Sequence, residues 1–257
     1  MAMDQAFLIL LTAHLVGDFV LQNDYMVERK DTNLLVLLLH VILVTAMTAL
    51  FLGTLPWPIL AVVFCSHFAM DYIKPRMTQR CWSKIGTFTI DQCVHLSVLI
   101  LLAAFVPNAA DDGFWMQSLN DTGKEWYMLG LTFTCGVIVA VSVGGHVIAL
   151  ITSSLIEQVK DEGDLQSTQK GELDGLENGG RYIGWLERAL VMLIIMMGQP
   201  SGVGFLVAAK SILRFGDIKD GHQRRVAEYV IIGTFLSFGW AMLTAVLMVQ
   251  TIEYWRE

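Results

Sequence analysis

Residues 34–54 have the sequence LLVLLLHVILVTAMTALFLGT, an apolar run without a single charged residue. Its length matches the roughly 20 residues that a helix needs to cross the hydrocarbon core of a bilayer. The whole chain has 257 residues, of which 54% are apolar and 16% are charged, whereas soluble domains carry about 25% charged residues. This composition excludes a typical soluble globule and predicts a polytopic membrane protein.

The rest of the chain repeats this pattern, so we predict an all-α fold, a transmembrane helical bundle of about eight segments. The segments are 5–21, 34–54, 57–73, 88–106, 127–155, 183–198, 201–213 and 226–251. The seventh is short for a crossing, so it is a tilted half-helix or a re-entrant element. We divide the chain into a four-helix membrane unit (1–106), an extracytoplasmic loop (107–126) and a second membrane half of about four helices (127–257), with a flexible cytoplasmic loop at 156–182.

The basic residues predict the orientation of these segments. If the segments alternate in direction, only Lys124 and Arg256 of the 17 Lys and Arg residues fall on one side. Because cytoplasmic loops carry the excess of Lys and Arg, the other side is cytoplasmic. We therefore expect a multi-pass protein of the cell (inner) membrane with both termini outside the cytoplasm.

Histidine and aspartate recur inside the first four segments at a spacing of four residues. The pairs are His14 with Asp18, His67 with Asp71, and Asp91 with His95, and His40 lies in the second segment. A spacing of four places both side chains of a pair on one helix face. On the assigned topology the four histidines share one depth, roughly 10 Å from the cytoplasmic end, and the aspartates lie one layer closer to that end.

Imidazole with carboxylate favours a divalent transition metal such as Zn, Mn or Fe. We therefore expect His14, Asp18, His67, Asp71, Asp91 and His95 to be metal ligands, with His40 as a ligand or a general base. The number of ligands suits one ion, with the aspartates orienting the histidines, or two ions about 3.5–4 Å apart. Buried His–Asp hydrogen bonds between helices, or a proton relay, are the alternatives.

The second half of the chain carries charged residues at a similar predicted depth. Arg188 with Lys210 is a candidate clamp for a phosphate or a lipid headgroup beside the metal centre. Alternatively, both side chains extend to the membrane surface or pair with acids such as Glu187. We expect membrane lipids as partners, with a lipid or another phosphate-containing molecule as substrate. No nucleic-acid-binding motif is present, and the oligomeric state is left open.

The motif residues resemble a family of prokaryotic membrane proteins known as a domain of unknown function. The resemblance rests on His14-Leu-Val-Gly-Asp18-Phe, on His67-Phe-Ala-Met-Asp71 and on Asp91-Gln-Cys-Val-His95, over about the first 105 residues. The pattern is more distantly similar to that of membrane-bound metal-dependent hydrolases. The function expected from the residues is hydrolysis of a phosphate or acyl ester; the alternatives are a metal-ion or proton-coupled transporter or channel, and a membrane scaffold with a structural His/Asp network.

Overall fold

The computed structural model describes residues 2–79, 82–160, 179–215 and 221–257, and all regular elements among them are helices. They are α1 (Ala2–Phe19), α2 (Asp24–Arg29), α3 (Leu34–Leu52), α4 (Trp57–Gln79), α5 (Lys84–Phe105), α6 (Phe114–Ser118), α7 (Asp121–Val137), the π-helix η1 (Ile138–Val143), α8 (Gly144–Lys160), α10 (Gly179–Met196), α11 (Gly202–Phe215) and α12 (Gly221–Arg256). The all-α prediction is confirmed. Both ends of the predicted loop 156–182 are helical, and residues 161–178 lie outside the described residues.

Within the described parts of the chain, five helical stretches are long and apolar enough to cross a membrane. They are Ala2–Phe19, Leu34–Leu52, Lys84–Phe105, Asp121–Ser153 and Glu228–Arg256. Large apolar side chains on these helices are exposed; Leu35 and Phe105, for example, are 75% and 82% exposed. Such surfaces suit lipid contact, so the chain has the features of a membrane protein. The count of eight crossings stays a prediction.

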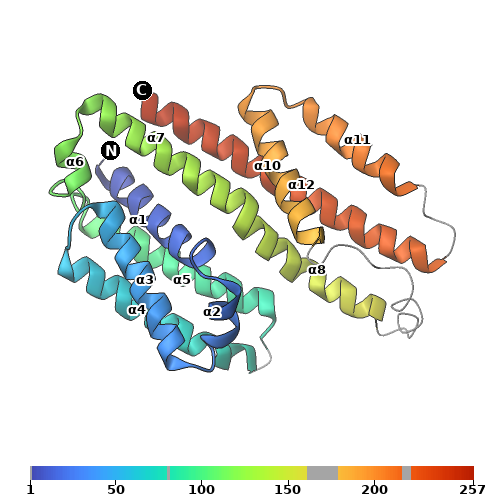
Figure 1. Cartoon of the computed structure of the whole chain (residues 1–257), viewed down its shortest axis with the longest axis horizontal. Helices are drawn as coiled ribbons and strands as arrows, with labels where there is room; N and C mark the ends of the chain where they lie inside the picture. The colour runs from blue at the N-terminus through green and yellow to red at the C-terminus, as the bar shows by residue number, and fades with distance from the viewer. Residues whose placement is uncertain (1, 80–81, 161–178, 216–220) are drawn as a thin grey trace. The chain divides into compact units, whose positions relative to one another are not determined.

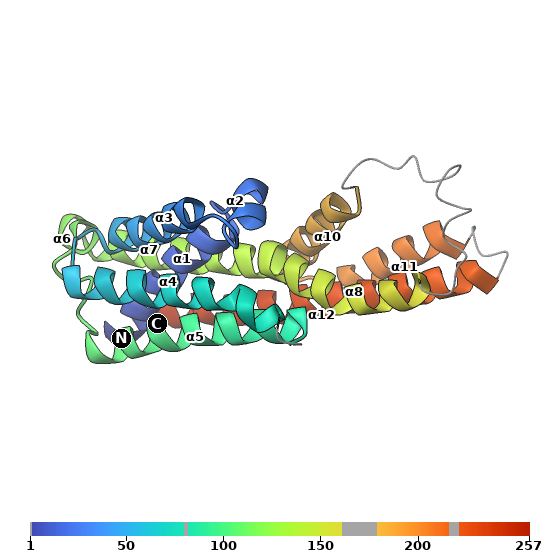
Figure 2. The same ribbon diagram turned by 90° about the horizontal axis from the view of Figure 1, so that it is seen from below.

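The chain divides into two compact units, residues 1–138 with 251–257 and residues 139–250. In the first unit α1, α3, α4 and α5 form a closed ring, because each packs against the next and α5 packs against α1 (Figures 1 and 2). Helix α7 packs on α1, and α2 packs on α3. Consecutive ring helices run antiparallel (Figure 1); the connections from α3 to α4 and from α4 to α5 are short, whereas the connection from α1 to α3 contains α2.

Local hydrogen bonds explain where the ring helices begin and end. The side chain of Asn33 accepts a hydrogen bond from the Leu35 amide at the start of α3, and Ser83 accepts one from Gly86 at the start of α5. Such caps satisfy amides that have no partner within the helix. Helix α3 ends at Leu52, and the capping residue Gly53 has a φ of 68°, a left-handed conformation that glycine adopts without strain.

Helices α1 and α3 approach closely beside Asp18. A Cβ atom added to Gly17 would lie 2.8 Å from Cγ2 of Val44 and 3.1 Å from its Cα. Because only a residue without a side chain fits here, Gly17 allows α1 to place His14 and Asp18 against α3. The contact thus positions two of the predicted site residues.

The second unit begins within the π-helix η1, which no sequence pattern predicts. A π-helix replaces the usual i→i+4 hydrogen bonds by i→i+5 bonds and is commonly a short interruption of an α-helix. Side chains from other helices donate to two of its carbonyl groups, Trp240 Nε1 to Val139 at 2.8 Å and Arg188 Nη2 to Val141 at 2.9 Å. These donors stabilise the irregular backbone.

Candidate metal centre

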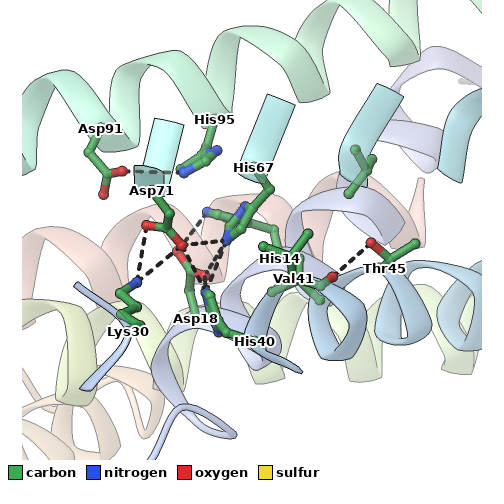
Figure 3. A network of polar contacts seen from close by, with 12 residues as sticks. His14, Asp18, Lys30, His40, Val41, Thr45, His67, Asp71, Asp91 and His95 are labelled. Atoms are coloured by element: carbon green, nitrogen blue, oxygen red, sulfur yellow. Dashed lines mark hydrogen bonds and ion pairs between the residues drawn. The ribbon is translucent and has the colours of Figure 1, made fainter. Parts of the chain in front are cut away.

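The seven predicted site residues of the first unit lie together inside the ring (Figure 3). Helices α1, α4 and α5 each contribute a His and an Asp, and α3 contributes His40. None of the seven side chains is more than 9% exposed. The spacing of four works as predicted, because each pair projects from one helix face into the ring.

Asp18 lies among three of the four histidines. Its Oδ1 atom is 3.1 Å from Nε2 of His67 and 3.2 Å from Nε2 of His40, and its Oδ2 atom is 3.7 Å from Nε2 of His14. The three histidines come from three helices. One carboxylate therefore faces imidazole nitrogens on α1, α3 and α4.

The histidine rings also contact one another. Nε2 of His40 and Nε2 of His67 are 3.0 Å apart, and the rings of His67 and His95 stack with centroids 4.2 Å apart. A neutral imidazole carries a proton on only one nitrogen, so a hydrogen bond between these two Nε2 atoms requires one of them to lack a proton and accept with its lone pair. Lone pairs on converging imidazole nitrogens are what a metal ion binds.

Asp71 and Asp91 extend the cluster toward α5. Asp71 Oδ2 lies 3.3 Å from His40 Nε2 and 3.6 Å from His67 Nε2. Asp91 Oδ1 lies 3.3 Å from His95 Nε2. The ligand atoms therefore form one continuous group across the ring.

Several of these buried atoms make no hydrogen bond despite their close neighbours. They include Asp18 Oδ1, Asp91 Oδ1 and His95 Nε2, whose contacts lack hydrogen-bond geometry. Buried polar groups almost always have a hydrogen-bond partner, and an unsatisfied one costs about 1–3 kcal/mol. Carboxylate oxygens and an imidazole nitrogen, atom types that bind transition metals, are thus left without a hydrogen-bond partner.

Three overlapping sets of side chains bring their ligand atoms within 4.8 Å of one another. The sets are His14, Asp18 and His67; His40, His67 and Asp71; and Asp71, Asp91 and His95. Because neighbouring sets share a residue, the cluster suits one ion or two adjacent ions. The donor types fit the expected Zn, Mn or Fe.

Two lysines that we did not predict as site residues contact the aspartates. Lys30 Nζ lies 3.0 and 3.2 Å from the two carboxylate oxygens of Asp71, and Lys74 Nζ lies 2.7 Å from Asp91 Oδ2. Lys74 follows Asp71 by three residues, so both side chains lie on one face of the helix. This spacing could have identified Lys74 as a site residue. Lys30 approaches from the end of α2, and no sequence spacing predicts that contact.

A small cavity of about 10 Å³ adjoins the histidines within the ring. Its wall includes His14, His67 and His95, the hydroxyl-bearing Thr48 and Ser66, and apolar side chains. This volume is close to the minimum for one water molecule. The histidines therefore border a space in which a single water fits.

Arg188 and Lys210 belong to the second unit. Lys210 Nζ lies 2.7 Å from Glu187 Oε2, the pairing that the alternative interpretation expects. Arg188 is buried and, besides Val141, donates to Ser237 Oγ at 3.2 Å. Their role as a clamp beside the metal centre stays a prediction.

The fold and the cluster define a class: a helical protein with helices long and apolar enough to cross a membrane, and with a buried His/Asp centre that suits metal. Residues 6–120 match the model of a family described as a protein of unknown function (DUF3307). The matched residues include the whole His/Asp cluster, and the predicted resemblance to a domain of unknown function is confirmed over this part of the chain. No curated protein and no solved structure matches the chain, and the likeness to metal-dependent hydrolases stays a prediction.

Proposed function

We propose that this protein is an integral membrane enzyme that uses one or two divalent transition-metal ions to hydrolyse a phosphate or acyl ester. The observation that carries the proposal is the set of buried carboxylate and imidazole atoms without hydrogen bonds. Inside a membrane helix ionisable residues are costly, and their presence is usually functional. Bound metal would use these lone pairs and offset the cost.

The seven residues of the cluster form two sets of candidate ligands, with His40 beside them. His14, Asp18 and His67 form one ligand set, and Asp71, Asp91 and His95 form another. His40 contacts Asp18 and Asp71 and is a ligand or the general base. A divalent ion held here would supply Lewis-acid activation of water and of the ester at neutral pH. The cavity beside His14, His67 and His95 has room for that water.

We infer the orientation from the distribution of Lys and Arg. The positive-inside rule places the site near the cytoplasmic face of the cell (inner) membrane, with both termini outside. At this depth a lipid headgroup of the cytoplasmic leaflet is within reach, so a lipid is a candidate substrate. An impermeant thiol reagent applied to intact cells carrying single-cysteine variants at either end of α1 tests this orientation.

Metal analysis of the purified protein tests the metal centre. We expect at least one transition-metal ion per chain in the wild type and loss of metal in the double variant His67→Ala/His95→Ala. His146→Ala, in the second unit, is the matched control and keeps the metal. Absence of transition metal from the wild type, or full retention in the double variant, refutes the metal centre.

Turnover tests the hydrolase step separately. Chromogenic phosphate and acyl esters of p-nitrophenol, offered to metal-loaded protein in detergent, are expected to release product at a rate that a chelator abolishes. The rate is also expected to fall at least 100-fold in His40→Ala, because a general base or a ligand is lost. A metal-loaded protein that cleaves neither ester class, including lipid esters supplied in vesicles, contradicts the hydrolase.

The cavity supports a second candidate, a metal-ion or proton-coupled transporter. Thr48 and Ser66 line the cavity together with the histidines, so polar groups continue from the cluster along the inside of the ring. His and Asp chains at membrane depth serve proton and ion pathways. Metal- or pH-dependent flux in proteoliposomes, without product from any ester, is the result that favours this candidate over the enzyme.

A further inference from the structure

The two lysines change the charge of the cluster. Asp18, Asp71 and Asp91 bring three negative charges, and Lys30 and Lys74 bring two positive charges next to Asp71 and Asp91. With neutral histidines, which metal binding requires, the cluster carries one net negative charge. One divalent ion makes this net charge positive, and a second ion makes it more so.

An uncompensated buried positive charge is costly, so the metal-loaded cluster favours an anionic molecule. A phosphate ester supplies at least one negative charge at neutral pH, whereas a carboxylic ester supplies none. Net charge therefore discriminates between the two substrate classes that the metal centre alone leaves open.

The surroundings of the two ammonium groups differ. Lys30 donates hydrogen bonds to both carboxylate oxygens of Asp71. It also donates to Oε1 of Gln22 at 2.8 Å, with the orientation of that amide assigned from its hydrogen bonds. An ammonium group has three N–H donors, so Lys30 has none to spare. Its side chain is 9% exposed, which fits a residue that positions Asp71.

Lys74 has donors to spare. Among the described residues its Nζ atom hydrogen-bonds to Asp91 Oδ2 alone, and its side chain is 26% exposed. It lies on the same face of α4 as Asp71, toward the end of the helix. Lys74 therefore combines a charge at the metal centre with access from outside.

We infer that Lys74 binds the phosphate group of an anionic substrate, so that the hydrolase acts on a phosphate ester and not on a neutral acyl ester. This inference rests on the proposed function. Lysine is a common point-charge binder of phosphate, and the N–H donors that Lys74 leaves unused among the described residues suit an oxygen-rich ligand. The phosphate group belongs to a lipid headgroup or to a soluble ester.

Binding of inorganic phosphate to the metal-loaded protein tests the inference, with affinity measured by equilibrium dialysis of radiolabelled phosphate in detergent. We expect Lys74→Gln, which keeps a donor for Asp91 but loses the charge, to weaken phosphate binding at least tenfold. Lys74→Arg keeps the charge and is expected to bind within about threefold of the wild type. Lys84→Gln removes an exposed lysine of the same unit and is expected to bind as the wild type does.

Metal content separates the two proposals. If the wild type holds no metal, the proposed function fails. If Lys74→Gln keeps its metal and binds phosphate within twofold of the wild type, the inference about Lys74 fails and the metal centre stands. A measurement on the wild type covers the case in which Lys74→Gln does not fold. Phosphate is expected to slow the labelling of Lys74 by an amine-reactive reagent and to leave the labelling of Lys84 unchanged. If Lys74 is labelled at the same rate with and without phosphate, the inference is overturned.

Vesicles distinguish the two sources of phosphate. Protein reconstituted with phosphatidic acid in phosphatidylcholine is compared with protein in phosphatidylcholine alone. Competition of phosphatidic acid with free phosphate assigns the group to a lipid headgroup. Unchanged phosphate binding assigns it to a soluble ester.

Discussion

Replacing Lys30 by Met tests whether the ion pair with Asp71 lies in a dry, buried environment. Lys30 Nζ lies 3.0 Å from Asp71 Oδ1, and the two side chains are only 9% and 2% exposed. At this distance the attraction is about 5.5 kcal/mol for an effective dielectric constant of about 20. Removing one partner of a buried pair leaves the other charge uncompensated and costs about 3–5 kcal/mol.

The free energy of unfolding is measured by equilibrium denaturation with sodium dodecyl sulfate in mixed micelles, with a chelator present. We expect Lys30→Met to lose about 3–5 kcal/mol, and Lys84→Met, at an exposed position, to change by less than about 0.5 kcal/mol. Adding Asp71→Asn to Lys30→Met removes the uncompensated charge and is expected to restore part of the loss. Zinc is expected to reduce the loss in Lys30→Met as well, because the ion replaces the missing positive charge beside Asp71.

A change of less than about 0.5 kcal/mol in metal-free Lys30→Met would show that Asp71 is hydrated and does not depend on Lys30. The argument for a dry, charge-balanced cluster would then be wrong. A loss that zinc leaves unaltered would mean that Asp71 takes no part in metal binding.

Three glycine substitutions test how tightly the helices pack at individual glycines. For each variant the free energy of unfolding is measured in the same micelles. Gly17→Ala forces a Cβ atom to within 2.8 Å of Val44 and is expected to cost about 1–3 kcal/mol and to weaken metal binding, so unchanged metal affinity contradicts the role of this contact. Gly145→Ala brings a Cβ atom to within 2.7 Å of Arg188 Nη2 and is expected to cost a similar amount; no loss would mean that Arg188 is not fixed there. Gly239→Ala meets no atom within 4 Å and is expected to stabilise α12 by about 0.5–1 kcal/mol, whereas clear destabilisation would reveal a packing contact at this face.

The helices and most of the candidate site could be predicted because both depend on short-range periodicity. An apolar run of about 20 residues and a pair spaced by four residues each leave a direct trace in the sequence. His14 with Asp18, and Asp91 with His95, needed no knowledge of distant contacts to be grouped. Their common depth followed from counting residues along antiparallel helices.

The contacts that escaped prediction join elements distant in the sequence. Lys30 is 41 positions from Asp71 and lies at the end of a short helix that no apolar run indicates. The π-helix depends on donors from Arg188 and Trp240, both far along the chain from it. Such donors become visible only when the helices are packed.

The ring of helices also bears on the order of events during synthesis. Helix α1 is made first, yet one of its ring neighbours is α5, and the rings of His14 and His95 lie 5.1 Å apart only once both helices are in place. Ionisable side chains within a membrane-spanning segment are costly where they face lipid. Until α5 emerges from the ribosome, one of the helices that enclose His14 and Asp18 is missing. The nascent chain must therefore keep these side chains beside α3, in water or against the insertion machinery. The last ring helix to be translated is thus the one that seals the polar interior from lipid.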